Sequence, residues 1–191
     1  MVVDAPTVYT VGHSTRTLDE LVAVVEQAGV RELIDVRLLP RSRRHPHLAG
    51  EALARSLPAR GIAYAHEPRL GGFRRPRAGS PNSGWEHPAF RGYADHMASP
   101  EFLAGLARLQ QLARERTACV MCAEAQWWRC HRRLIADALL VRGWRVLHLG
   151  LASTPLVHEL TPFAVVGPAH ALTYPAPQGE LAFGDLAGSS A

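Results

Sequence analysis

The chain has 191 residues, of which 47% are hydrophobic and 20% charged, proportions typical of a soluble globular protein. This length suffices for one domain with a sizeable core, and no segment approaches the roughly 20 apolar residues of a membrane span. The N-terminal residues lack the features of a secretory signal, and three cysteines do not make a disulfide framework. We therefore expect a cytoplasmic protein without membrane association.

All 21 basic residues are arginines, which excludes chemistry that needs a Schiff-base lysine or a P-loop lysine. Twelve arginines fall within residues 31–91 against five acidic residues, whereas the rest of the chain carries nine against twelve. This local surplus indicates an acidic partner, either an anionic small molecule such as a phosphate or nucleotide, or a nucleic acid. A solvated basic loop is an equally good interpretation.

Apolar residues recur with the periods of strands and helices in alternation. Thr17 and Glu20 form a capping box, Ser99 precedes Pro100 at a helix start, and Gly29 ends a helix. The predicted elements, in chain order, are a strand at 8–11, a helix from 17 to 29, strands at 32–36 and 62–66 separated by a helix at 49–60, a helix at 99–116, a strand at 118–121, a helix ending at 142, and a strand at 144–149. This alternation predicts a three-layer α/β fold, with helices on both faces of a mostly parallel five-stranded sheet.

We expect one α/β domain over residues 1–172, followed at 173–191 by a flexible tail rich in Pro, Gly and Ser that has little to bury. Residues 73–92 are rich in Arg, Pro, Gly and Ser and show no periodicity, which predicts a long loop. Loops of that length in compact domains are usually functional or disordered.

Residues suited to chemistry follow the predicted strands. They are His13 and Ser14 after the first strand, Asp35 and Arg37 after the second, Gly71 and Gly72 after the third, and Cys122 and Glu124 after the fourth, with His148 near the end of the fifth. In open parallel sheets, ligands bind beyond the carboxyl ends of the strands. We therefore expect these segments, distant in sequence, to meet in one cleft.

The segment Cys122–Arg133 joins a strand to the N-terminus of a helix and contains two thiols, a carboxylate, an imidazole and several guanidiniums. A cysteine at such a place has a lowered pKa and becomes a better nucleophile. We expect Cys122 to be the nucleophile, His131 or His13 to transfer protons, and Glu124 to orient the imidazole. A buried structural cysteine is the alternative.

The thiols could instead bind a metal. We expect no cofactor, and the alternative is a metal bound by Cys122, Cys130 and His131, with His13 as a fourth ligand. Cys119 does not fit such a site, because residues three apart on one strand face opposite sides of the sheet. Cys122 and Cys130 could also form a reversible disulfide, so Cys130 belongs to the predicted catalytic set.

Arginines at the start of a helix oppose its macrodipole, and a bound anion would remove this conflict for Arg132. The loop 40–46 offers guanidiniums and a hydroxyl suited to phosphate oxygens. The predicted substrate-binding residues are Ser14, Asp35, Arg37, Ser42, Arg43, Gly71, Gly72, Tyr93 and Arg132. Trp127 and Trp128, beside the cysteines, could provide stacking surfaces for a base.

Several of these segments together resemble a bacterial and archaeal family known as domain of unknown function 488. The matching segments are Thr10–Ser14, Asp35–Arg37, Pro40–Arg43, Leu70–Gly72, Asn82, Trp85, Gly92–Tyr93, Met121–Glu124, Cys130–Arg132 and the helix that leads to Gly143. The resemblance covers residues 8–150, and the departures are Leu48, where an aromatic is usual, and His45, where Asn is common. It implies an α/β fold and a site that includes the two cysteines, and it implies no particular reaction.

The first functional hypothesis is a cysteine-dependent enzyme that acts on a phosphorylated, nucleotide-like or nucleic-acid substrate at the carboxyl ends of the strands. The second is a non-catalytic nucleic-acid-binding module that uses the Arg-rich region 37–77. The third is a Cys/His metal site. The sequence does not determine the oligomeric state, and a homodimer is one possible assembly.

Overall fold

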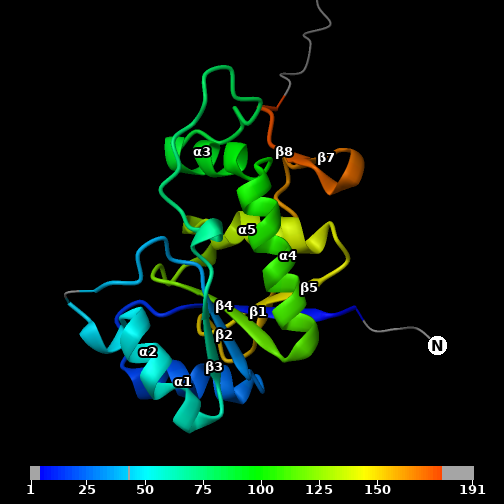
Figure 1. The fold of residues 1–191 in the computed structure, drawn as a ribbon. Coiled ribbons are helices and arrows are strands. Elements are labelled where there is room, and N and C mark those ends of the chain that lie inside the picture. Colours follow the sequence, from blue (N-terminus) through cyan, green and yellow to red (C-terminus); the bar gives the residue numbers. More distant parts are fainter. Residues whose placement is uncertain (1–4, 43, 178–191) are drawn as a thin grey trace, which may run out of the picture.

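The structure, a computed structural model, describes residues 5–42 and 44–177. A six-stranded sheet runs through it in the order β3-β2-β4-β1-β5-β6 (Figure 1). The strands are β1 (Thr7–Gly12), β2 (Glu32–Asp35), β3 (Ala63–His66), β4 (Ala118–Cys122), β5 (Arg145–His148) and β6 (Leu156–Val157). The first five strands are parallel, and β6 pairs antiparallel with β5. The predicted mostly parallel α/β sheet is confirmed, with β6 as an additional edge strand too short to produce a sequence period.

Helices cover both faces of the sheet, as predicted. They are α1 (Leu18–Gln27), α2 (Gly50–Ser56), α3 (Pro88–His96), α4 (Pro100–Glu115) and α5 (Arg132–Leu140). Apolar residues of α1 and α2 pack on one face, and those of α3, α4 and α5 pack on the other (Figure 1). In the described part of the chain, no helix has the length and apolar character needed to cross a membrane.

The side chains of β4 point alternately to the two faces of the sheet. Val120 and Cys122 belong to the core beneath α3, α4 and α5, whereas Cys119 and Met121 belong to the core beneath α1 and α2. This is the two-residue period of a strand buried on both sides. Cys119 and Cys122 therefore face opposite sides of the sheet, as the sequence predicts.

The region predicted as a long loop contains the first residues of α3. Pro88 occupies the first turn of that helix, and the His87 side chain accepts a hydrogen bond from the Ala89 N–H at 3.2 Å. Gly92 lowers helix propensity and so hides the helix from a pattern-based prediction. The structure needs glycine there, because a Cβ would lie 2.4 Å from the Arg74 carbonyl oxygen.

Two further boundaries differ from expectation. The helix predicted at 49–60 is α2 followed by a short 3-10 turn that begins at Pro58, a residue unable to continue the helical hydrogen bonds. The predicted tail starts too early, because Thr173 belongs to a small hairpin and the Tyr174 side chain is fully buried. Residues 178–191 lie outside the described residues.

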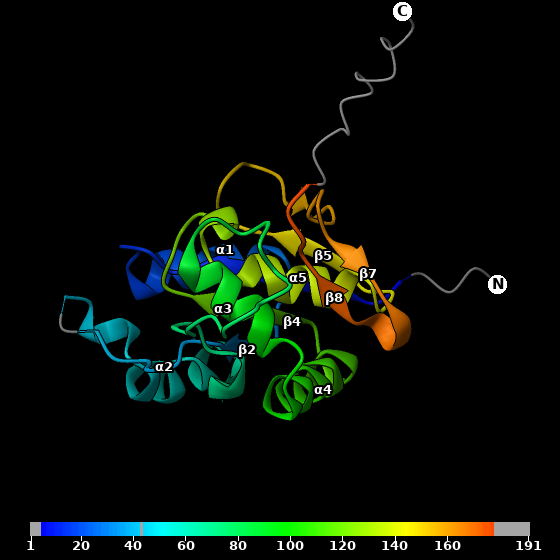
Figure 2. The ribbon, with the colours of Figure 1, turned by 90° about the horizontal axis from the view of Figure 1, so that it is seen from above.

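That hairpin consists of β7 (Val165–Val166) and β8 (Leu172–Thr173), which pair antiparallel. Figure 2 shows it at the opposite end of the molecule from α2, and Figure 1 agrees. Its last residues carry the chain back to α5 and to the segment before α3, where the Tyr174 N–H donates to the Asn82 side-chain oxygen at 2.9 Å.

Candidate functional site

Cys122, Cys130 and His131 form a compact cluster at the carboxyl end of β4. Cys122 is the last residue of β4, and the other two immediately precede α5. The two sulfur atoms and a ring nitrogen of His131 all lie within 4.8 Å of one another. Cys122 is 8% exposed and Cys130 is 4% exposed, so both thiols are nearly covered.

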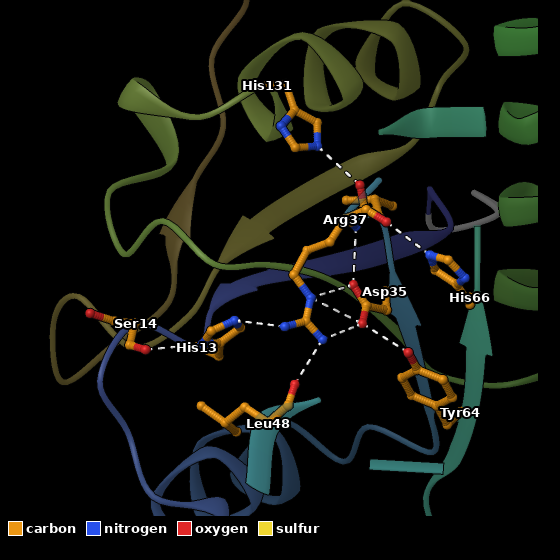
Figure 3. Close-up of polar contacts among 9 residues, drawn as sticks. His13, Ser14, Asp35, Arg37, Leu48, Tyr64, His66 and His131 are labelled. Atoms are coloured by element: carbon orange, nitrogen blue, oxygen red, sulfur yellow. Dashed lines mark hydrogen bonds and ion pairs between the residues drawn. The ribbon is translucent and has the colours of Figure 1, made fainter. Parts of the chain in front are cut away.

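The His131 ring has one defined orientation. Its Nε2 lies 3.3 Å from the Val36 carbonyl oxygen (Figure 3). Because a carbonyl only accepts, Nε2 carries the hydrogen and Nδ1 is left facing Cys130 Sγ at 3.7 Å. The arrangement of a thiol, an imidazole and an acceptor that orients the imidazole is the one used to activate nucleophiles.

Glu124 does not orient the imidazole, contrary to expectation. Its side chain is exposed, and its carboxylate accepts a hydrogen bond from the Gln126 N–H at 3.3 Å. The Val36 carbonyl has the role predicted for that carboxylate. The contribution of Glu124 to the site comes from its backbone carbonyl, which accepts a hydrogen bond from Arg132.

The two thiols of the cluster differ in acid strength. A hydrogen bond from Cys122, assisted by His131 and Arg132, holds the pKa of Cys130 well below its ordinary value, although burial acts in the other direction. The same hydrogen bond, together with burial, raises the pKa of Cys122 well above its ordinary value. These opposite directions favour a thiolate on Cys130 over one on Cys122. The expectation of a low pKa at Cys122 is wrong, because His131 acts on Cys130.

Arg132, the first residue of α5, has a side chain that is only 1% exposed. Its guanidinium donates to the carbonyl oxygens of Glu124 and Ala125 and to Thr10 Oγ1, the last at 3.3 Å, whereas its Nε has no hydrogen-bond partner in the described chain. No carboxylate of the described residues forms an ion pair with this buried cation. The charge of Arg132 also contributes, after Cys122 and His131, to the lowered pKa of Cys130.

A chain of buried hydrogen bonds continues from Thr10 to Asp137. Asp137 Oδ1 accepts from His158 Nε2 at 2.9 Å, so His158 Nδ1 accepts from His148 Nε2 at 3.1 Å. His148 Nδ1 then accepts from the Thr10 hydroxyl at 2.7 Å. Arg132 and Asp137 are therefore joined through Thr10, His148 and His158, and in this arrangement of tautomers every donor is directed toward Asp137.

The far end of this chain is held by further contacts. The Tyr174 hydroxyl donates to Asp137 Oδ2 at 3.0 Å, and the Thr161 N–H donates to Asp137 Oδ1 at the same distance. Trp127 stacks on His148 with ring centroids 4.2 Å apart and planes inclined by 5°. Trp127 is partly buried against His148, so of the pair predicted to stack on a base only Trp128 is exposed.

Asp35 and Arg37, which follow each other closely at the end of β2, form a buried ion pair (Figure 3). Arg37 donates to both carboxylate oxygens of Asp35 at 2.5 to 3.1 Å and to the Leu48 carbonyl at 2.9 Å. The Tyr64 hydroxyl donates to Asp35 at 2.8 Å. Because Asp35 neutralises Arg37 inside the protein, the pair braces the loop after β2 and is not the open anion site that the sequence suggested.

His13 is held between this ion pair and its own backbone. Arg37 Nη1 donates to His13 Nε2 at 3.0 Å, so the hydrogen is on Nδ1, which donates to the Ser14 carbonyl at 3.0 Å (Figure 3). Burial, followed by the charge of Arg37, lowers the pKa of His13 to about 4. Both ring nitrogens are engaged, so His13 is not the free base that was expected.

The paired glycines bring the loop after β3 against the cluster. A Cβ on Gly72 would lie 3.0 Å from His131 Nδ1, and one on Gly71 would lie 2.9 Å from the Leu38 Cα. Tyr93 packs beside His131 with ring centroids 5.1 Å apart and donates its hydroxyl to the Leu70 carbonyl at 2.7 Å. These three predicted substrate-binding residues thus form the cover of the site.

The remaining predicted residues lie away from the thiols or are not described. Ser14 lines a shallow depression beside the start of α1 and has a φ of +49°. The Ser42 hydroxyl accepts from the His45 N–H at 2.9 Å, which shapes the loop after β2. Arg43 lies outside the described residues.

The buried chain that supports Arg132 contains residues that the sequence analysis did not assign to the site. Of these residues, Asp137 could have been found from the sequence, because its carboxylate occurs among the apolar residues of a predicted helix. Thr10 and His158 gave no such signal. The Val36 carbonyl gave none either, because a backbone acceptor has no residue-type signature.

The chain matches the model of a known protein family. The family described as Domain of unknown function DUF488 has a model that matches residues 17–139. The chain belongs to this family. The match runs from the capping residue of α1 through most of α5, so it includes Cys122, Cys130 and His131. Searches of curated proteins and of solved structures give no match. For this member of DUF488, function must therefore be argued from the site.

The burial of neutral His13 predicts a dependence of stability on pH. Its pKa is about 4 in the fold against 6.5 ordinarily, so between these values the unfolded chain binds a proton that the folded chain does not. The stabilisation is complete above pH 6.5 and is lost as the pH falls toward 4, by up to about 3 kcal/mol. Denaturant unfolding of His13→Asn should therefore show a weaker pH dependence than wild type. The exposed His170→Asn control should match wild type, and equal slopes for all three proteins would contradict the assignment.

Asp137 should be far more important for stability than an exposed aspartate. Asp137→Asn removes the charge that accepts from His158 and Tyr174, and we expect a loss of about 2 to 4 kcal/mol in the free energy of unfolding. Asp19→Asn, which breaks an exposed pair with Arg60, should cost less than about 1 kcal/mol. Urea unfolding of both variants measures the difference. Similar losses would mean that the buried chain contributes little.

Proposed function

We propose that this chain is a cysteine-dependent enzyme that acts on an anionic substrate at the carboxyl ends of β1, β2 and β4. The observation that carries the proposal is the pair formed by Cys130 and His131, in which a thiol with a low pKa faces an imidazole nitrogen at 3.7 Å. Thiolates are the reactive form of cysteine, and such pairs recur in enzymes that use covalent catalysis. Cys130 thereby takes the role first expected of Cys122.

Each residue of the cluster has a part in this chemistry. The Cys130 proton passes to His131 Nδ1 as the thiolate forms. Cys130 Sγ then attacks an electrophilic carbon or phosphorus of the substrate, and Nδ1 gives this proton to the leaving group as its bond breaks. Cys122 retains its proton and donates to the resting thiolate. The Val36 carbonyl keeps Nδ1 directed at the sulfur throughout.

An anionic substrate is supported by Arg132. Its buried guanidinium has no ion-pair partner among the described carboxylates, and its Nε lacks a hydrogen-bond acceptor. When the Cys130 thiolate is consumed by bond formation, the positive charge of Arg132 loses its neighbouring anion. Negative charge on the substrate or on the leaving group then takes its place, which favours phosphorylated, nucleotide-like or nucleic-acid substrates.

The cover of the site implies a movement. The two thiols are 8% and 4% exposed, and Gly72 lies against the ring of His131. In this proposal, the segment that carries Gly71 and Gly72 moves away from His131 to admit the substrate. Closed sites of this kind exclude water, which strengthens the electrostatic interactions within them.

A second candidate function is a metal centre made by the same three residues. Two thiols and one imidazole form the Cys2His set that zinc uses in catalytic sites, with a fourth position left for water or substrate. The hydrogen bond from His131 Nε2 to the Val36 carbonyl is the outer contact that metal-bound histidines usually make. Bound zinc would act as a Lewis acid there, and the Cys122 thiol would also have to lose its proton.

The enzyme proposal predicts which cysteine reacts first. We expect iodoacetamide to alkylate Cys130 with a pH midpoint below the ordinary 8.5 of a free thiol, measured for each cysteine by mass spectrometry. Cys122→Ala removes the donated hydrogen bond and should raise that midpoint by about one pH unit or more. Cys119→Ala, on the opposite face of the sheet, should leave it unchanged. Faster alkylation of Cys122 than of Cys130 would sink the proposal.

The metal alternative predicts stoichiometric zinc. The full chain, incubated with zinc chloride and passed through gel filtration, should retain about one zinc per chain by elemental analysis. Cys130→Ser should abolish retention, whereas Cys119→Ser should preserve it. Retained zinc should also protect Cys122 and Cys130 from alkylation. Absence of retained zinc would remove this alternative and leave the enzyme proposal standing.

A further inference from the structure

Three large apolar side chains are exposed on the loops beside the thiol cluster. Leu39 is 72% exposed, Phe73 is 94% exposed and Trp128 is 41% exposed. They follow β2, β3 and β4, which are neighbours in the sheet. Loops that follow adjacent parallel strands leave the sheet at the carboxyl ends of those strands. The three side chains therefore lie at the same end of the sheet as Cys122.

Direct contacts tie these loops to the cluster. Gly72, which precedes Phe73, lies against His131, and Leu38, which precedes Leu39, lies against Gly71. Trp128 lies in the 3-10 turn that ends immediately before Cys130. Each exposed apolar side chain is therefore one or two residues from a residue that packs in the site or belongs to the thiol cluster.

Exposed arginines on the same loops carry charge that the protein does not neutralise. Arg41 and Arg44 follow β2, Arg75 follows β3, and Arg129 follows β4, and all four are exposed. Within residues 5–42 and 44–177 none of them forms an ion pair, whereas nearby Arg74 pairs with Glu101 at 3.3 Å. Free guanidiniums around a site attract polyanions and bind phosphates well.

Phe73 is unfavourable for folding in two independent ways. Its ring is almost wholly in water, and its φ of +61° lies in the left-handed region that suits glycine. Neither its exposure nor its backbone conformation stabilises the folded chain. The position therefore points to a partner that contacts the ring.

We propose that Phe73, Trp128, Arg41, Arg44, Arg75 and Arg129, here called the rim, bind single-stranded nucleic acid. Aromatic rings stack on the faces of unpaired bases, and the arginines contact the phosphates between them. A duplex hides its base faces, and an acidic peptide offers charge without flat rings, so both fit the rim less well. The inference names the substrate class of the proposed enzyme, and it rests on that proposal only for what happens at Cys130.

Fluorescence anisotropy of the full chain tests the rim. The probes are labelled single-stranded DNA and RNA of about 12 nucleotides, a duplex of the same length, and polyglutamate of matched charge. We expect the single strands to bind at least about 10-fold more tightly than polyglutamate or duplex, with log K falling linearly as log salt rises. Equal affinity for polyglutamate, a preference for duplex, or no binding of single strands at low salt would overturn the inference.

Two pairs of variants separate stacking from charge. Phe73→Ala should weaken single-strand binding by roughly 5- to 100-fold, the range expected for loss of one stacked base. Leu103→Ala, an exposed apolar residue on α4, should have no effect. Arg75→Ala should lower the salt dependence by about one phosphate contact, whereas Arg145→Ala, at the opposite end of the sheet, should not. Unchanged binding by Phe73→Ala would reject the rim as a stacking surface.

The same assay distinguishes the rim from the enzyme. If single strands bind but the alkylation assay gives Cys130 an ordinary pKa, the enzyme proposal is rejected and the rim is retained. If the alkylation assay gives Cys130 a low pKa but single strands do not bind, the rim is rejected and the enzyme proposal is retained.

Discussion

Arg132 is the point at which β1, the loop after β4, and α5 are joined. Its guanidinium bonds to Thr10 on β1 and to the carbonyls of Glu124 and Ala125, and its backbone starts α5. A chain of buried hydrogen bonds links it to Asp137, and its positive charge favours the thiolate form of Cys130. The reactivity of the thiol and the packing of α5 on the sheet therefore depend on the same buried charge.

The thiol cluster is balanced between two kinds of chemistry. In the proposed enzyme, Cys122 keeps its proton and Cys130 is the thiolate nucleophile. If a cation removes that proton, the pair and His131 become three ligands of a metal. Arg132 opposes the second state, because a divalent cation would lie near a buried guanidinium that forms no ion pair with any carboxylate of the described residues. This repulsion supports the proposed thiolate enzyme over the proposed metal centre.

The positions of the elements could be read from the sequence because apolar periodicity and strand order are linked to the fold. Alternation along β4 placed Cys119 and Cys122 on opposite faces, and the rule of parallel strand ends brought Cys122 and His131 to one edge. The helix α3 was missed because Gly92 serves a tertiary contact and weakens the local signal.

The pairing of the site residues could not be read in the same way. Spacing gave no reason to prefer Cys130 over Cys122, because their acid strengths depend on which sulfur lies beside His131. The Val36 carbonyl is invisible in a residue pattern, since every residue has one. Asp35 and Arg37 looked like ligand-binding groups, and only the fold reveals that they bind each other.

The hydrogen-bond chain between Arg132 and Asp137 has a single direction, which restricts how relatives can differ. Each intermediate must accept from one side and donate to the other, so serine can replace Thr10, whereas valine cannot. Loss of His148 or His158 would leave the two buried charges without a connection. Substitutions along this chain should therefore accumulate together in the same lineages, and a relative that lacks one member should lack its neighbours as well.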